Sequence, residues 1–192
     1  MYELPTSIKL GDKEFKIRND GDFRLVLDCF NALNDSELTE QERLISCLII
    51  FYEDLNSVSD INQLADIKGA IQKMYDFFIC GEVDTSNTQD YKLIDWDKDS
   101  QMIAAAINNV AKTEVRSLPY LHWWTFMGYY ISVGDSLLAT VVGIRNKIVK
   151  HKKLEKYEEE FRKENPQYFV WDNRSLQQKL DDELIKNIWN NR

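Results

Sequence analysis

The sequence lacks the residue pairings that metal sites and disulfide frameworks need. Its 192 residues include three cysteines and two histidines, and neither type recurs at the short spacing of a zinc site. Cys29, Cys47 and Cys80 are widely spaced and lie among apolar residues, so we expect reduced, buried thiols. We therefore expect no metal ion, no cofactor and no disulfide.

Positive charge and long apolar runs are also scarce. The chain carries 24 Lys and Arg residues against 32 Asp and Glu, a net charge of −8. This balance disfavours a general affinity for nucleic acid or for anionic membranes. No apolar run approaches the ~20 residues of a membrane span, and the first residues show no signal peptide. We expect a cytosolic protein with a substantial core, because 44% of its residues are hydrophobic.

Catalytic motifs are missing as well. His122 and His151 are the only candidates for a general base at neutral pH, and neither accompanies a serine or cysteine nucleophile motif. The glycines of the C-terminal half are isolated and form no phosphate-binding loop. We expect a protein that is not an enzyme, because active sites need convergent polar groups.

The acids Asp95, Asp97 and Asp99 resemble the start of a calcium loop. The resemblance fails at Ser100, where such a loop needs glycine, and at Ala106, where it needs a carboxylate that binds with both oxygens. We assign the three acids to the N-terminal end of a helix, where negative charge is favourable.

Apolar spacing predicts an N-terminal β-hairpin. Ile8 and Leu10 alternate with polar residues before Gly11-Asp12, and Phe15 and Ile17 do so after it. This period of two places one face on a core, and Gly-Asp suits a tight turn with positive φ. A lone hairpin is marginal in water, so we expect it to lie across helices.

The rest of the chain predicts helices, because apolar residues recur there at spacings of three and four. Thr39 begins a capping box, and Gly81 is placed to end the third helix. Asp135 or Ser136 is placed to cap the helix that begins at Leu137. The expected helices cover residues 22–33, 39–54, 61–78, 96–110, 119–134, 137–148, 154–165 and 175–189. The predicted fold is mainly α, a helical bundle of about seven or eight helices with an N-terminal β-hairpin.

We expect one helical unit over residues 1–192. Its parts are the hairpin at 1–20, N-terminal helices at 21–81, a polar linker at 82–95 and C-terminal helices at 96–192.

The most distinctive segment is 118–126, which reads Leu-Pro-Tyr-Leu-His-Trp-Trp-Thr-Phe. Adjacent tryptophans on a helix point about 100° apart, so this segment must serve two packing surfaces. Aromatic residues surround the expected helix on nearly every side, which favours core packing over a binding surface. Exposure of Trp123 or Trp124 would reverse that preference.

A basic run at residues 145–153 contrasts with residues 19–60, where ten acids face only two bases. One interpretation is a nucleic-acid contact. Another is a solvated helix end, whose lysines complement the helix dipole and pair with the acids that follow. A third is self-association, in which the basic run of one copy meets the acidic half of another. The second interpretation is favoured, and nucleic acid is disfavoured.

The order of these features resembles the bacteriophage gene-product-fifteen family, found in tailed phages and prophages of Gram-positive bacteria. The resemblance spans most of the chain. Its most specific part is Leu-His-Trp-Trp-Thr-Phe at 121–126. The other parts are Leu-Pro-Thr at 4–6, the hairpin residues 11–18, Asp-Trp-Asp-Lys-Asp at 95–99, and Ile-Arg at 144–145 with the basic helix after it.

The resemblance implies a role in tail morphogenesis, because genes of this kind lie between those of the major tail protein and the tape-measure protein. That position is typical of tail assembly chaperones, which act in the host cytoplasm and keep the long helical tape-measure chain soluble. The partners implied are the tape-measure protein and the major tail protein. A structural component of the tail or of the head–tail junction is the alternative.

An aromatic groove over an amphipathic helix would suit such a chaperone. The residues that we expect at this partner-binding site are Tyr120, Trp123 and Trp124 as anchors, with Arg145, Lys147, Lys150 and Lys152 as electrostatic contacts.

Overall fold

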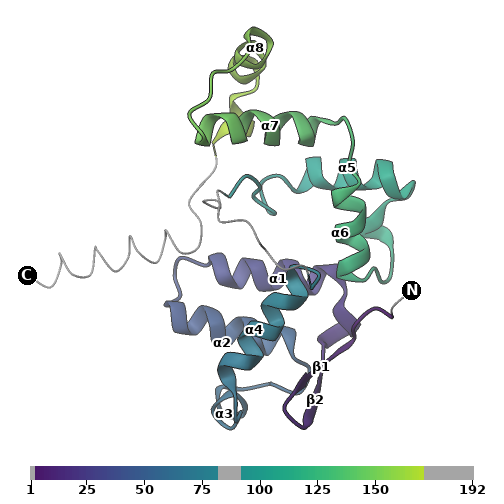
Figure 1. The fold of residues 1–192 in the computed structure, drawn as a ribbon, viewed down its shortest axis with the longest axis vertical. Helices are drawn as coiled ribbons and strands as arrows, with labels where there is room; N and C mark the ends of the chain where they lie inside the picture. The colour runs from purple at the N-terminus through teal and green to yellow at the C-terminus, as the bar shows by residue number, and fades with distance from the viewer. Residues whose placement is uncertain (1–2, 82–91, 171–192) are drawn as a thin grey trace, which may run out of the picture. The chain divides into compact units, whose positions relative to one another are not determined.

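The structure, a computed structural model, describes residues 3–81 and 92–170. Within these residues, eight α helices and one two-stranded antiparallel sheet confirm the expected mainly α fold with an N-terminal hairpin (Figure 1). The elements are β1 Ser7–Leu10, β2 Lys13–Lys16, α1 Phe23–Asn34, α2 Glu40–Phe51, α3 Val58–Asn62, α4 Ile67–Phe78, α5 Ser100–Ala111, α6 Trp123–Ile131, α7 Leu137–Val149 and α8 Lys156–Glu164. None of the helices in these two stretches combines the length and apolar character that crossing a bilayer demands. The helix expected at 175–189 lies outside the described residues.

Contacts within the chain divide it into two units. Unit 1 contains Met1–Thr85 and Leu118–Gly128, and unit 2 contains Ser86–Ser117 and Tyr129–Arg192. Unit 1 therefore includes the aromatic segment 118–126, which the expected organisation grouped with the C-terminal helices.

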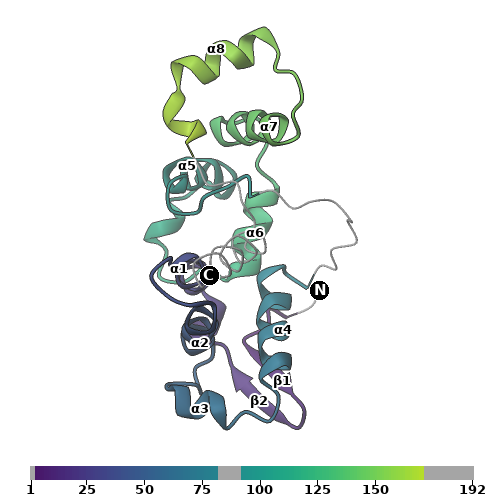
Figure 2. The same cartoon turned by 90° about the vertical axis from the view of Figure 1, so that its left-hand side faces the viewer.

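The hairpin packs on helices, as expected from its small size. Gly11 supplies the positive φ of the two-residue turn, at +60°, and Ile8 pairs with Phe15 across the strands. The outer edge of β2 is covered by the chain that follows α2. The Lys16 N–H donates to a carboxylate oxygen of Asp54, and the Glu53 N–H donates to the Lys16 carbonyl oxygen. Figure 2 shows the hairpin beside α4.

The prediction of one continuous helix over residues 61–78 is wrong. Helix α3 ends at Asn62, and α4 begins at Ile67, where the Asp66 carboxylate accepts the Gly69 N–H. A Cβ on residue 69 would collide with that carboxylate, so glycine makes the cap possible. An aspartate that caps a new helix cannot also continue the old one.

Several predicted helix ends are confirmed. Thr39 and Glu42 form the capping box of α2, and Ser136 caps α7 by accepting the Ala139 N–H. Gly81 follows α4 with a φ of +72°, and its N–H donates to the Asp76 carbonyl oxygen. Sequence signals at helix ends therefore predicted these boundaries better than the apolar spacing did.

The core of unit 1 is aromatic and contains free thiols. The Phe51 ring lies edge-on to the rings of Phe77 and Phe78 at centroid distances of 5.3 and 5.6 Å. Cys29 and Cys47 are buried, as expected, whereas Cys80 is only partly buried. A hydrogen bond with the neighbouring Cys47, together with burial, raises the pKa of the Cys29 thiol, so this group stays protonated and apolar in character.

Candidate partner-binding site

The aromatic segment begins as extended chain, and the prediction that Pro119 opens a helix is wrong. Helix α6 starts at Trp123. The Leu121 N–H donates to the Asp22 carboxylate, and the Phe23 N–H donates to the Leu121 carbonyl oxygen, both at 2.9 Å. These two hydrogen bonds hold the chain before α6 against the start of α1.

His122 occupies the position before α6 and caps the helix. Its Nδ1 accepts the Trp124 N–H at 3.0 Å, and its Nε2 lies 3.1 Å from the Pro5 carbonyl oxygen. This arrangement requires the neutral ring with its proton on Nε2. The side chain is 1% exposed, and burial lowers the pKa of His122. His122 is therefore a structural residue that links α6 to the N-terminal chain.

The two adjacent tryptophans serve two surfaces, as their spacing predicted. Trp123 is 1% exposed, packs beside Phe126 and donates its indole N–H to the Phe78 carbonyl oxygen. Trp124 is only partly buried and donates its indole N–H to the Phe77 carbonyl oxygen at 3.0 Å. The indole of Trp123 is enclosed in the core, so we leave it out of the candidate binding surface.

Trp124 lines a shallow hollow of about 420 Å³, which we call the Trp124 groove. Apolar walls come from the N-terminal chain, from β1 and from α4, and Lys73 pairs with Asp76 at the rim. The indole hydrogen bond fixes the Trp124 ring in place, which lowers the entropy cost of binding against it. The lining residues are Pro5, Ser7, Ile8, Lys9, Lys73, Asp76, Phe77, Gly81 and Trp124.

The free edge of β1 borders this groove. The Ile17 N–H donates to the Thr6 carbonyl oxygen, so the alternation of an antiparallel pair turns the backbone groups of Ser7 and Lys9 away from β2. Those groups bond to no other described residue of the chain. The groove thus offers an apolar wall and free backbone groups, two features that bind peptide chains.

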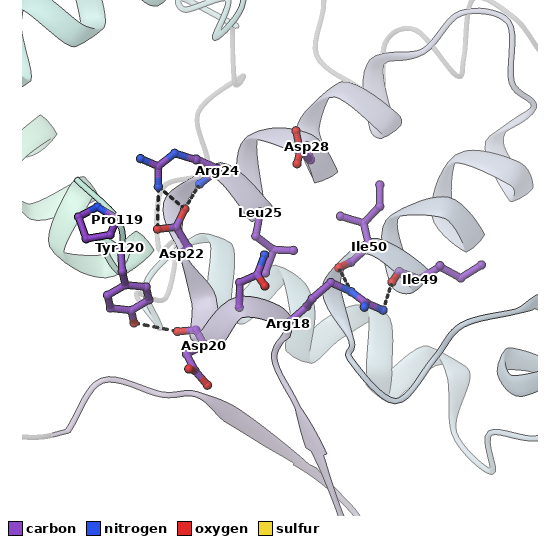
Figure 3. A pocket seen from close by; sticks show the side chains of 11 residues that line it. Arg18, Asp20, Asp22, Arg24, Leu25, Asp28, Ile49, Ile50, Pro119 and Tyr120 are labelled. Carbon is purple, nitrogen blue, oxygen red and sulfur yellow. Dashed lines mark hydrogen bonds and ion pairs between the residues drawn. The ribbon is translucent and has the colours of Figure 1, made fainter. Parts of the chain in front are cut away.

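Tyr120 lines a second hollow of unit 1, with a volume of about 830 Å³, which we call the Tyr120 pocket (Figure 3). Tyr120 is 45% exposed, and its hydroxyl donates to the Asp20 carbonyl oxygen at 3.0 Å. Leu25, Ile49 and Ile50 provide apolar lining on the opposite side.

Charged side chains surround the apolar lining of the Tyr120 pocket. The Arg18 guanidinium donates to the carbonyl oxygens of Ile49 and Ile50 at the end of α2, where a cation complements the helix dipole. Arg24 pairs with Asp22 at 3.0 Å. These contacts engage both arginines with the protein itself.

Arg145 lies at the centre of unit 2 and is 1% exposed. It forms a bidentate ion pair with Asp99, in which two guanidinium nitrogens bond to the two carboxylate oxygens. It also donates to the carbonyl oxygens of Leu93 and Tyr168. Such complete pairing is what a buried guanidinium needs. We therefore leave Arg145, like Trp123, out of the candidate binding surface.

The other bases of the run differ from Arg145. Lys147 pairs with the buried Glu158 at 2.7 Å, and this pairing lowers the pKa of Glu158. Lys150 and Lys152 are exposed, and their ammonium groups form no ion pair with a described residue. The expected pairing of the basic run with the acids that follow it is therefore present at Lys147. Within the part of the chain that the structure describes, Lys150 and Lys152 show no such pairing.

The structure divides the expected site residues among separate places. Tyr120 and Trp124 lie in unit 1, each in a hollow of its own. Lys147 lies in the last turn of α7 in unit 2, and Lys150 and Lys152 follow that helix.

Three features of these surfaces escaped sequence reasoning. Asp99 partners Arg145 across 46 residues, which no local pattern reveals. Arg18, in the short 3-10 turn after β2, caps the end of α2. His122 caps the start of α6, a position that Ser, Thr, Asp or Asn more often fills. No group of three or more His, Cys, Asp or Glu side chains able to hold a metal occurs in residues 3–81 and 92–170.

These observations define a class: a mainly helical protein with an N-terminal hairpin and open hollows on the surface of unit 1. Comparison with protein families gives a narrower assignment. The family model described as bacteriophage Gp15 protein matches residues 1–169. The chain belongs to this family and is a bacteriophage protein, which confirms the resemblance seen in the sequence. No curated protein and no solved structure matches the chain.

Proposed function

We propose that this protein is a tail assembly chaperone that binds the tape-measure protein during phage morphogenesis. Membership of the bacteriophage Gp15 protein family makes a role in building the phage particle the natural starting point. The observation that carries the proposal is the Trp124 groove, where a fixed indole and the free edge of β1 lie together. An apolar, chain-shaped partner suits that surface.

The same proposal makes binding, and not catalysis, the activity of the chain. Its setting is the host cytoplasm during assembly. The net charge of −8 supports the chaperone role, because repulsion between like-charged complexes keeps a long apolar partner from aggregating.

Co-expression with the tape-measure protein of the same phage tests the proposal. We expect the tape-measure protein to move from the insoluble to the soluble fraction and to co-purify with this chain. Equal insolubility with and without the chain, together with no co-purified complex, would contradict the proposal.

Variants of the groove make the test specific. Trp124→Ala removes the anchor, and Ser7→Trp adds a large ring at a lining position in a strand that tolerates aromatic residues. Both should abolish co-purification. Lys13→Trp is the matched control, because it adds the same ring to the same hairpin at an exposed position that does not line the groove.

Mass spectrometry of purified particles separates the proposal from the structural alternative. A chaperone should be missing from mature particles. Stoichiometric amounts in the particle would favour a component of the tail or of the head–tail junction.

A further inference from the structure

The Tyr120 pocket keeps two acidic groups open to a partner. Asp28 projects from α1 and forms no ion pair or hydrogen bond within the described part of the chain (Figure 3). Among the described residues, the Asp20 carboxylate has only a distant contact with the Lys16 ammonium group, at 3.8 Å, and both of those side chains are 54% exposed. Arg18 and Arg24 also line the pocket and already bond to other groups of unit 1, and three aspartates against two arginines leave the lining with a net negative charge.

The pocket also offers what the rest of a lysine side chain needs. The methylene stem of lysine packs on apolar surface while its ammonium group stays in contact with water or acids. Leu25, Ile49 and Ile50 provide such a surface, and the exposed ring of Tyr120 can stack against a cation. The pocket volume of about 830 Å³ is large enough for more than one side chain.

The complementary surface is present on the same chain. Lys150, Lys152 and Lys153 follow α7 within four residues, and all three are exposed. Their ammonium groups form no ion pair with a described residue, whereas Lys147, earlier in the run, is held by Glu158. We call residues 150–153 the lysine segment.

We infer that the lysine segment of one copy of this protein docks in the Tyr120 pocket of a second copy. Charge complementarity carries the inference, because open carboxylates and open ammonium groups lie on separate units of one chain. Such a contact joins two different surfaces, so it either repeats head to tail or is made twice about a two-fold axis. It goes beyond tape-measure binding and does not depend on it, since the Trp124 groove takes no part.

Charge reversal tests this contact in the full chain. An acid variant carries Asp20→Lys and Asp28→Lys, and a base variant carries Lys150→Glu, Lys152→Glu and Lys153→Glu. We expect light scattering and sedimentation to show salt-sensitive association of the unaltered protein, weakened by about tenfold or more in each variant alone. Mixing the two variants should restore association, because the acid variant still carries the lysine segment and the base variant still carries the pocket.

Three results would overturn the inference. The unaltered protein could be monomeric at every concentration, which is also the result expected if the lysine segment filled the pocket of its own chain. Both variants could associate as well as the unaltered protein. The variants could also be monomeric both alone and mixed.

A matched control separates this contact from a general effect of net charge. Asp35→Lys with Glu37→Lys changes the charge by the same amount as the acid variant, at exposed positions outside the pocket. This control should associate like the unaltered protein. Circular dichroism of each variant checks that the helices remain.

Discussion

Unit 1 packs aromatic rings against one another, whereas unit 2 encloses an ion pair. In unit 1, Trp123 lies beside Phe126, and the Phe126 ring stacks on Phe23 at 4.6 Å. In unit 2, Arg145 and Asp99 are both almost fully buried and join α7 to the start of α5. Apolar packing tolerates small changes of shape, but a buried charge is stable only while its partner is present. The two units should therefore respond differently to mutation.

Loss of the buried pair should have the largest effect. Arg145→Ala leaves the Asp99 carboxylate buried without its partner and removes the donors to Leu93 and Tyr168. We expect a loss of about 3–5 kcal/mol in the free energy of unfolding. Hydrogen exchange should place that loss in α5 and α7 of unit 2.

The double variant Arg145→Met with Asp99→Leu is the control for this result. It removes both charges together, so most of the stability should return. A cost of less than about 1 kcal/mol for Arg145→Ala would contradict a central role for the pair.

Truncation of the buried indole should have a similar or slightly smaller effect on unit 1. Trp123→Ala opens a cavity beside Phe126 and leaves the Phe78 carbonyl oxygen without its donor. Such truncations cost about 3–5 kcal/mol. We expect Trp123→Phe to recover part of the loss, and hydrogen exchange to change in unit 1 while unit 2 stays protected. Equal loss of protection in both units would contradict their separate stabilisation.

The smallest of these effects concerns pH and unit 1. Burial lowers the pKa of His122 below the ordinary 6.5, so the unfolded chain takes up a proton at a pH where the folded chain does not. The stability that neutral His122 contributes is present above pH 6.5 and is lost as the pH falls through its folded pKa. The free energy of unfolding can change by up to about 1.4 kcal/mol per pH unit in this range.

Denaturation at several pH values checks this prediction. His122→Asn keeps an N-cap acceptor for Trp124 and cannot take up the proton, so its stability should change less between pH 7 and pH 5. His151→Gln alters an exposed histidine and should keep the original slope. An unchanged slope in His122→Asn would contradict the buried neutral ring.

The same contrast explains how much of the fold could be predicted from the sequence. Local signals predicted the hairpin turn at Gly11, the capping box at Thr39 and a cap at Asp135 or Ser136, because each depends on residues that are neighbours in the chain. Ser136 is the residue that forms this cap. Apolar spacing predicted the helices but not the break before Ile67. A short side chain that competes for backbone N–H groups interrupts a helix without changing its apolar pattern.

Long-range pairings limited the prediction of the candidate site. The aromatic segment was recognised as distinctive, and the separation of Trp123 from Trp124 followed from helix geometry. The partners of Arg145 and Tyr120 could not be predicted, because Asp99 and Asp20 lie 46 and 100 residues away. A basic run therefore looked uniform in the sequence, although Arg145 is buried and Lys150 is exposed in the structure.

Tape-measure binding by a pair of variants tests the claim that the two hollows take different partners. That claim assigns an apolar partner to the Trp124 groove and leaves the Tyr120 pocket free for a second copy. Co-purification with the tape-measure protein should be lost in Ser7→Trp and kept in the double variant Asp20→Lys with Asp28→Lys. Retention of the tape-measure protein by Ser7→Trp, or its loss only in the charge variant, would contradict this assignment.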